Sequence, residues 1–201
     1  MSYRDFSLKK VQDVFQLRII EKLGIFSEVE SHPISQYLSD TLQENVSLAT
    51  SINTEKARSE LIIAPILVEI RKIVDRKVSL FSGIEFNVDK EKDLSGFCDF
   101  IISNSPEQLF LKAPVVTIVE AKNENIMGGL GQCLAEMIAA RMFNEKEGNS
   151  FPEIYGAVSS GNLWKFIKLA DNIAHIDLDD YSIKQPDVIV GILLAMVARN
   201  I

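Results

Sequence analysis

Three charged side chains stand at spacings that suit a divalent-metal site. Residues 115–119 form a nearly continuous apolar run, typical of a central strand buried on both faces. The run ends in Glu120, Ala121 and Lys122, and because alternate residues of a strand share a face, the acid and the lysine project to one side. An earlier strand carries Asp99 among apolar residues, where a carboxylate is costly to bury without a cation or hydrogen-bond donors.

Two carboxylates that meet on neighbouring strands make an oxygen-rich pocket suited to Mg²⁺ or Mn²⁺. Such an ion polarises a phosphoryl oxygen and lowers the pKa of a bound water, so hydroxide becomes available near neutral pH. We therefore expect Asp99 and Glu120 to be metal ligands, aided by the Ala121 carbonyl oxygen. Lys122 would orient the water or stabilise charge developing on the phosphate. Glu60, on an expected helix, would add a further acid through water.

Helices are expected at both ends of the chain and after the central strand. Apolar spacing and capping residues predict them over Ser7–Leu23 with Gly24 as the cap, from about Ser35 through Val46, from Asn53 or Thr54 through Ile70, from about Met127 to Asn144, and from Pro186 through Arg199. Pro65 lies inside the third of these helices and should kink it.

Strands are expected in between, where β-branched and aromatic residues are frequent and turn residues separate the runs. They are predicted over Val78–Val88, Ser95–Ser103, Ala113–Lys122, Ile154–Ser159, Leu163–Leu169 and Ile173–Leu178. The order predicts a single α/β domain over 1–201 with a mixed central sheet flanked by helices. We divide it into an N-terminal helical extension (1–50), an αβββαβ core (54–170) and a C-terminal helix (186–201).

The spacing from Asp99 to Glu120-Ala121-Lys122, within this order of elements, resembles the PD-(D/E)xK nuclease superfamily, which has the restriction-endonuclease-like fold. The resemblance covers roughly Thr54–Leu169. It implies that the aspartate and glutamate ligate the metal and that the lysine serves the attacking water.

The same resemblance extends to two residues on helices. Glu60 would be the helix-borne glutamate that precedes the strands, and Gln132 resembles the glutamine that some exonuclease-type branches keep after the lysine strand. The resemblance implies a metal-dependent nuclease, which hydrolyses phosphodiester bonds in nucleic acid with Mg²⁺ or Mn²⁺ as cofactor. DNA is the substrate we expect. A second acid-x-lysine triplet, Asp75-Arg76-Lys77, lies at an expected helix end instead of after a buried strand.

Structural alternatives exist for each candidate residue. Glu120 and Lys122 could form a surface ion pair at a strand end, and Asp99 could cap a turn or pair with Arg58. Glu60 could be a solvated helix acid bonded to Arg58 or to Lys56. Cys98 and Cys133 fit two reduced, half-buried thiols.

Composition narrows the classes of protein. The chain of 201 residues has 47% hydrophobic and 24% charged residues, as globular domains have, and neither a signal peptide nor a membrane-spanning run is expected. We therefore expect a cytoplasmic protein. The net charge of −7 disfavours binding of nucleic acid by bulk electrostatics. Two alternatives thus stay open: a catalytically silent binding or regulatory module with this fold, and a site for a small phosphorylated or acidic ligand. A homodimer or a partner protein is compatible with the amphipathic helix over Ser7–Leu23 and the apolar last helix.

Overall fold

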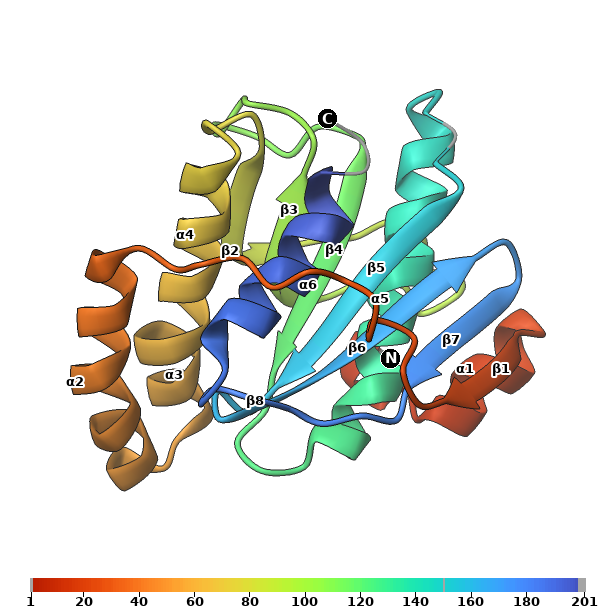
Figure 1. The fold of residues 1–201 in the computed structure, drawn as a ribbon. Coiled ribbons are helices and arrows are strands. Elements are labelled where there is room, and N and C mark those ends of the chain that lie inside the picture. The colour runs from red at the N-terminus through yellow and green to blue at the C-terminus, as the bar shows by residue number, and fades with distance from the viewer. Residues whose placement is uncertain (1, 150, 199–201) are drawn as a thin grey trace.

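Within residues 2–149 and 151–198, which the computed structural model describes, eight strands form one mixed sheet with helices on both faces (Figure 1). The strands are β1 (Arg18–Lys22), β2 (Ser79–Glu85), β3 (Phe97–Ser103), β4 (Val115–Ala121), β5 (Glu153–Ser159), β6 (Leu163–Ala170), β7 (Ile173–Asp177) and β8 (Tyr181–Ser182). The helices are η1 (Tyr3–Asp5), α1 (Leu8–Phe15), α2 (Gln36–Ile52), α3 (Glu55–Arg58), η2 (Ser59–Ile63), α4 (Ala64–Ile73), α5 (Ile126–Lys146) and α6 (Pro186–Ala198).

The strand order places β4 well inside the sheet. The order is β1-β7-β6-β5-β4-β3-β2, with β8 paired to β6. The pairs β1–β7 and β4–β5 are parallel, and the other pairs are antiparallel. All seven residues of β4 are buried, as its apolar and β-branched composition predicts for a strand covered on both faces.

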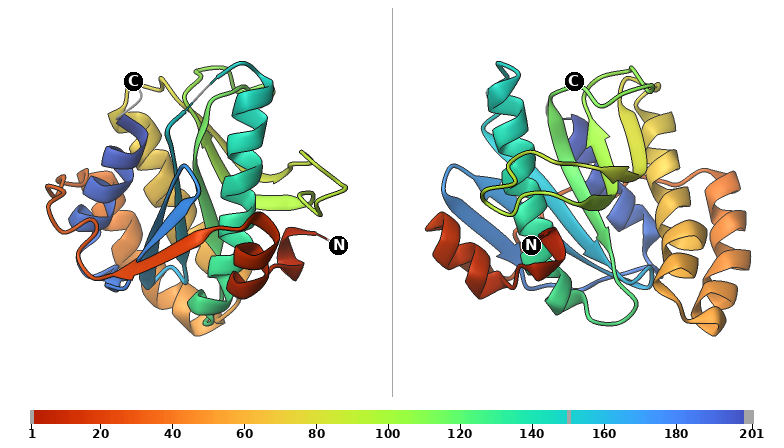
Figure 2. Two further views of the ribbon diagram at one scale, coloured as in Figure 1. Left: turned by 90° about the vertical axis from the view of Figure 1, so that its right-hand side faces the viewer. Right: turned by 180° about the vertical axis from the view of Figure 1, so that it is seen from behind.

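Helices form a layer on each face of the sheet, as the edge-on view in Figure 2 shows. Helices α1 and α5 cover one face and enclose a core with Leu130, Leu134 and Ile138 of α5. Helices α4 and α6 cover the other face and α2 packs outside them against η2 and α4; Ile66 and Leu67 of α4 belong to the core on this side. The α/β class with a mixed sheet and flanking helices, N-terminal helices included, is confirmed.

The expectation of one helix over Ser7–Leu23 is wrong. Helix α1 ends at Phe15, Gln16 takes a left-handed φ of 52°, and Arg18–Lys22 form β1, which runs parallel to β7. The two isoleucines at 19 and 20 have a high preference for strands, and a partner strand distant in sequence satisfies their backbone groups. The N-terminal segment therefore adds a strand to the sheet besides its helices.

The helix expected from Thr54 through Ile70 is one run with a change of winding. The Thr54 hydroxyl accepts from the Ala57 amide at 3.2 Å, so the predicted cap is present. Residues Ser59–Ile63 then form a π-helical turn directly before α4. Pro65 lacks an N–H and its ring crowds the carbonyl four residues earlier, which explains why the helix widens here.

The remaining elements follow the sequence pattern within one to three residues at most ends. The helix expected from Ser35 runs further than predicted, to Ile52, and α5 spans Ile126–Lys146. The turn between β5 and β6 uses Gly161 at a φ of +79°, as predicted for that hairpin. Helix α6 is described over Pro186–Ala198, and Arg199 lies outside the described residues. No helix in the described part of the chain is both long and apolar enough to cross a lipid bilayer.

Candidate active site

The candidate residues meet where β3 begins and β4 ends. Phe100 pairs with Val119 across the antiparallel ladder, so Asp99 and Glu120 are the next residues along the two strands. The Lys122 amide donates to the Ser159 carbonyl oxygen at 2.8 Å and so carries the alignment with β5 one residue past β4. Backbone pairing with both neighbouring strands therefore fixes the acid-x-lysine segment.

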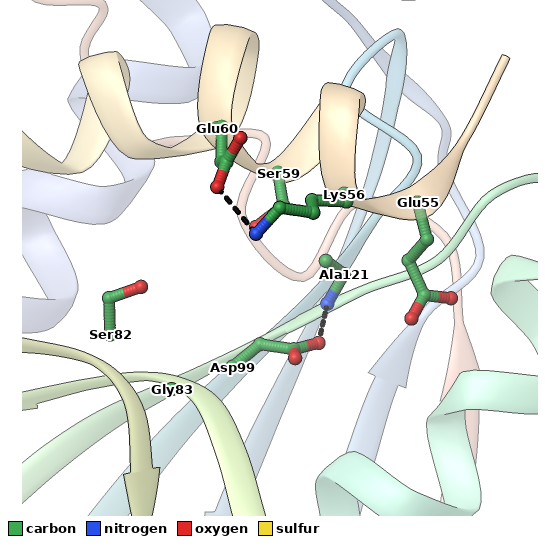
Figure 3. Close-up of a pocket in the computed structure, with 8 residues that line it drawn as sticks. All are labelled: Glu55, Lys56, Ser59, Glu60, Ser82, Gly83, Asp99 and Ala121. Atoms are coloured by element: carbon green, nitrogen blue, oxygen red, sulfur yellow. Dashed lines mark hydrogen bonds and ion pairs between the residues drawn. The ribbon is translucent and has the colours of Figure 1, made fainter.

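Asp99 is bound to the backbone of the neighbouring strand. Its Oδ2 accepts from the Ala121 amide at 2.8 Å, the bond drawn in Figure 3. The alternative ion pair with Arg58 is not the arrangement among the described residues, because that guanidinium donates to Asn53 Oδ1, Asn123 Oδ1 and the Ser160 carbonyl oxygen. Asp99 is thus held beside the backbone of the acid-x-lysine segment, and no cationic side chain within residues 2–149 and 151–198 forms an ion pair with it.

Glu120 and Lys122 form a buried pair and not the surface pair considered above. Lys122 Nζ lies 2.5 Å from Glu120 Oε1, and the two side chains are 19% and 2% exposed. The same Nζ donates to Gln132 Oε1 at 3.2 Å. The second carboxyl oxygen of Glu120, Oε2, is buried without a hydrogen-bond partner among the described residues. An ionised carboxylate in this position is left with half of its acceptor capacity unused.

Burial and charge shift the pKa values of this pair. Burial raises the pKa of the Glu120 carboxyl to about 8, and the nearby Asp99 charge adds to the rise against the opposing effect of Lys122. For Lys122, burial lowers the pKa, but the Glu120 carboxylate outweighs it and the net direction is upward. The lysine therefore stays an ammonium near neutral pH, while Glu120 holds its proton more tightly than an ordinary carboxyl.

A pocket of about 230 Å³ opens beside Asp99 (Figure 3). Its lining comes from the α3–η2 run, the edge strand β2 and the ends of β3 and β4: Glu55, Lys56, Ser59, Glu60, Ser82, Gly83, Asp99 and Ala121. Glu120 is 1% exposed and lies outside this lining. Asp99 and Ala121 therefore face the pocket, and the Glu120–Lys122–Gln132 group lies next to it in the interior.

Glu60 is placed on the pocket wall by the π-helical turn. Its carboxylate pairs with Lys56 at 2.8 Å, and the side chain is 61% exposed, so of the two ion-pair alternatives the lysine is the partner. A π-turn within an α-helix is frequent at functional sites, because it turns side chains away from the ordinary helical spacing. Glu60 shares the pocket with Asp99, although its present partner is on its own helix.

Two acidic residues near the site were missed from the sequence. Glu55, the first residue of α3, lines the pocket, and its charge raises the pKa values of Glu120 and Lys122. Glu136 on α5 is fully buried and accepts from Gln132 Nε2 at 3.1 Å. The signal for Glu55 was the N-cap at Thr54, which places this acid in the first turn of a helix. The signal for Glu136 was its spacing of four residues from Gln132 on a helix rich in apolar residues.

The candidate site offers few side-chain ligands to a hard divalent cation such as Mg²⁺. No group of three or more His, Cys, Asp or Glu suited to a metal ion occurs among residues 2–149 and 151–198. The protein ligands on offer are the carboxylates of Asp99 and Glu120 and the carbonyl oxygen of Ala121. Mg²⁺ commonly keeps several waters and takes only one or two carboxylates, so the types of these ligands are compatible with its chemistry. The unpartnered Glu120 Oε2 is an oxygen that such an ion would satisfy.

Comparison with known proteins identifies no matching family model and no curated protein with significant sequence similarity. The chemistry has to be argued from the site.

Proposed function

We propose that this protein is a metal-dependent nuclease of the PD-(D/E)xK type that hydrolyses phosphodiester bonds in DNA. The observation that carries the proposal is the juxtaposition of Asp99 with the buried Glu120–Lys122 pair across two adjacent strands. Asp99 and the Ala121 backbone border a pocket that is open to solvent, which gives a substrate access to the site.

The residues take distinct roles in this proposal. Asp99, Glu120 and the Ala121 carbonyl oxygen would hold Mg²⁺ or Mn²⁺, with Glu120 using the Oε2 atom that is now unpartnered. When bound, the ion would polarise a phosphoryl oxygen of the substrate and lower the pKa of a bound water. Lys122, fixed through Glu120 and Gln132, would donate to the attacking water or to the charged phosphate.

The helix wall completes the pocket in this proposal. Glu60 would contribute a further acid to the ion through a water, once Lys56 turns away from it. The freed ammonium of Lys56 would then face the phosphate backbone from the α3 side. Both groups are exposed, so they can change partners at little energetic cost.

The direct test is hydrolysis of labelled single- and double-stranded DNA and RNA with Mg²⁺ or Mn²⁺. Asp99→Ala, Glu120→Ala and Lys122→Ala should each lose the activity of the wild-type protein. Lys77→Ala is the matched control, because this exposed lysine ends the second acid-x-lysine triplet, in the turn after α4. Activity that persists in Lys122→Ala, or that falls equally in Lys77→Ala, would contradict the proposed role of the lysine.

One observation favours a second candidate function, a binding or regulatory module without catalysis. The pocket is lined by three acids, Glu55, Glu60 and Asp99, against one lysine, and the chain carries a net charge of −7. Such a surface repels a polyanion unless cations intervene. Titration with Mg²⁺ and Mn²⁺, followed by calorimetry and thermal shift, separates the two candidates. No response at millimolar ion, together with no hydrolysis, would favour the silent module.

A further inference from the structure

Three polar side chains are buried on α5, and two of them, Gln132 and Glu136, lie next to the candidate site. Gln132 and Glu136 are four residues apart, so they project from the same face of the helix. They are 5% and 0% exposed, and the same helix contributes Leu130, Cys133 and Met137 to the hydrophobic core on this face of the sheet. A carboxyl group at such a place demands a reason, because Asp and Glu are rarely fully buried without a partner.

The hydrogen-bond chain from this helix ends at the proposed catalytic lysine. Lys122 Nζ donates to Gln132 Oε1 at 3.2 Å, and Gln132 Nε2 donates to Glu136 Oε1 at 3.1 Å. An ammonium group can only donate, so the amide oxygen of Gln132 must face it. The amide nitrogen then has to find an acceptor on its other side, and Glu136 supplies one. The chain therefore has a single consistent direction.

Glu136 is placed unfavourably for stability. Its second oxygen, Oε2, is buried and has no hydrogen-bond partner among the described residues. Burial, and then the charge of Glu120, raises the pKa of Glu136 well above its ordinary value. An apolar side chain of similar volume would avoid this desolvation, since replacing buried charged groups by apolar ones is often neutral or stabilising. Stability alone does not account for a glutamate here.

We propose that Glu136 is a positioning residue that acts through Gln132: it fixes the side-chain amide so that its oxygen faces Lys122 Nζ. The inference rests on the proposed function, in which Lys122 serves the attacking water. Without Glu136 the amide of Gln132 is free to rotate, and the ammonium loses one of its two oriented acceptors.

The activity test uses two substitutions at one position. Glu136→Met keeps the volume but removes the acceptor, whereas Glu136→Gln keeps a carbonyl oxygen that can still accept from Gln132 Nε2. We expect Glu136→Met to lower kcat about 10- to 100-fold at unchanged KM, and Glu136→Gln to restore most of it. The melting temperature of Glu136→Met should stay level or rise. Glu69→Met is the matched control, because Glu69 on α4 is also a buried glutamate but accepts from the backbone amide of Ser35, the N-cap of α2, and the substitution should leave kcat unchanged.

A second readout does not depend on hydrolysis. The rate at which an amine-reactive reagent labels Lys122, followed by peptide mass spectrometry, reports how firmly its ammonium is held. The rate should rise in Glu136→Met and stay near the wild-type value in Glu136→Gln and in Glu69→Met. Equal labelling in all four proteins, or an unchanged kcat in Glu136→Met, would overturn the inference. A wild-type protein that cuts no nucleic acid while its labelling responds as expected would refute the nuclease proposal and leave the positioning role of Glu136 standing.

Discussion

Under the proposed function, binding of Mn²⁺ or Mg²⁺ should depend steeply on pH, because Glu120 would have to lose a proton before it could ligate the ion. Burial and the charge of Asp99 raise the pKa of Glu120 to about 8. Below that pH the carboxyl is protonated in the ion-free protein, and a protonated carboxyl is a poor ligand. The ion must therefore displace the proton, and affinity should increase as pH rises towards 8.

The magnitude follows from the fraction of ionised carboxyl. Each unit below pH 8 should weaken the apparent affinity about tenfold, so Kd at pH 6 should exceed Kd at pH 8 by about 50-fold. About one proton should be released per ion near pH 6.5 and almost none well above pH 8.

The ion-free protein should show the opposite trend in stability. The folded-state pKa of Glu120 lies above its ordinary value of 4.5, so the native state binds more protons than the unfolded state between those two values. The contribution of Glu120 to the free energy of unfolding should therefore be largest below pH 4.5. It should fall by up to about 1.4 kcal/mol per pH unit as pH rises towards 8. A bound ion should cancel part of this loss at the upper end.

Isothermal titration calorimetry from pH 6 to 8.5, in buffers of different ionisation enthalpy, measures both the affinity and the number of protons released. Glu120→Gln should bind more weakly and lose the pH dependence, while the remote control Glu69→Gln should keep it. A Kd that stays constant from pH 6 to 8, or a slope that persists in Glu120→Gln, would refute the assignment of Glu120 as the titrating ligand.

Three further outcomes follow from particular contacts. Lys122→Ala should lower kcat by about 100-fold or more in a hydrolysis assay while calorimetry still detects Mn²⁺ binding, since in the proposed function the lysine serves the water and not the ion. Asp177→Ala should lower the free energy of unfolding in urea by about 3 kcal/mol without changing Mn²⁺ affinity, because the Phe26 amide and the Tyr181 hydroxyl both donate to that buried carboxylate. Gly131→Ala should destabilise the protein by about 1–3 kcal/mol in the same experiment, because a Cβ would lie 2.4 Å from the backbone of Ser7. An unchanged urea midpoint would show that the N-terminal segment moves to make room for the methyl group.

Local patterns predicted most elements of the fold because each pattern is contained in its own segment. The apolar run before Glu120 is a central strand, and the residues from Ile126 to Lys146 form one helix. The failure at Arg18–Lys22 has a different origin, since near-helical spacing continues through these residues and their pairing partner β7 lies about 150 positions further on. A contact so distant in sequence leaves no local trace.

The candidate site was predictable only where strand geometry determines direction. Alternation along a strand places Glu120 and Lys122 on one face, and their short contact agrees with it. Helical acids give no such guidance, because a glutamate on a helix is usually exposed. Glu136 is an exception, because it lies on the buried side of α5. Glu55 lines the pocket only because α3, which begins at this residue, lies across the ends of β3 and β4. Both placements depend on tertiary packing.

The acidity of the pocket has a consequence for the order of binding under the proposed function. A phosphate group that enters first meets Glu55, Glu60 and Asp99 with one lysine to offset them, so its approach is repelled. A divalent cation that enters first neutralises two of these charges and presents a positive centre to the phosphate. Affinity for nucleic acid should thus be conferred by the ion and not by a basic surface, which reconciles a net charge of −7 with a polyanionic substrate.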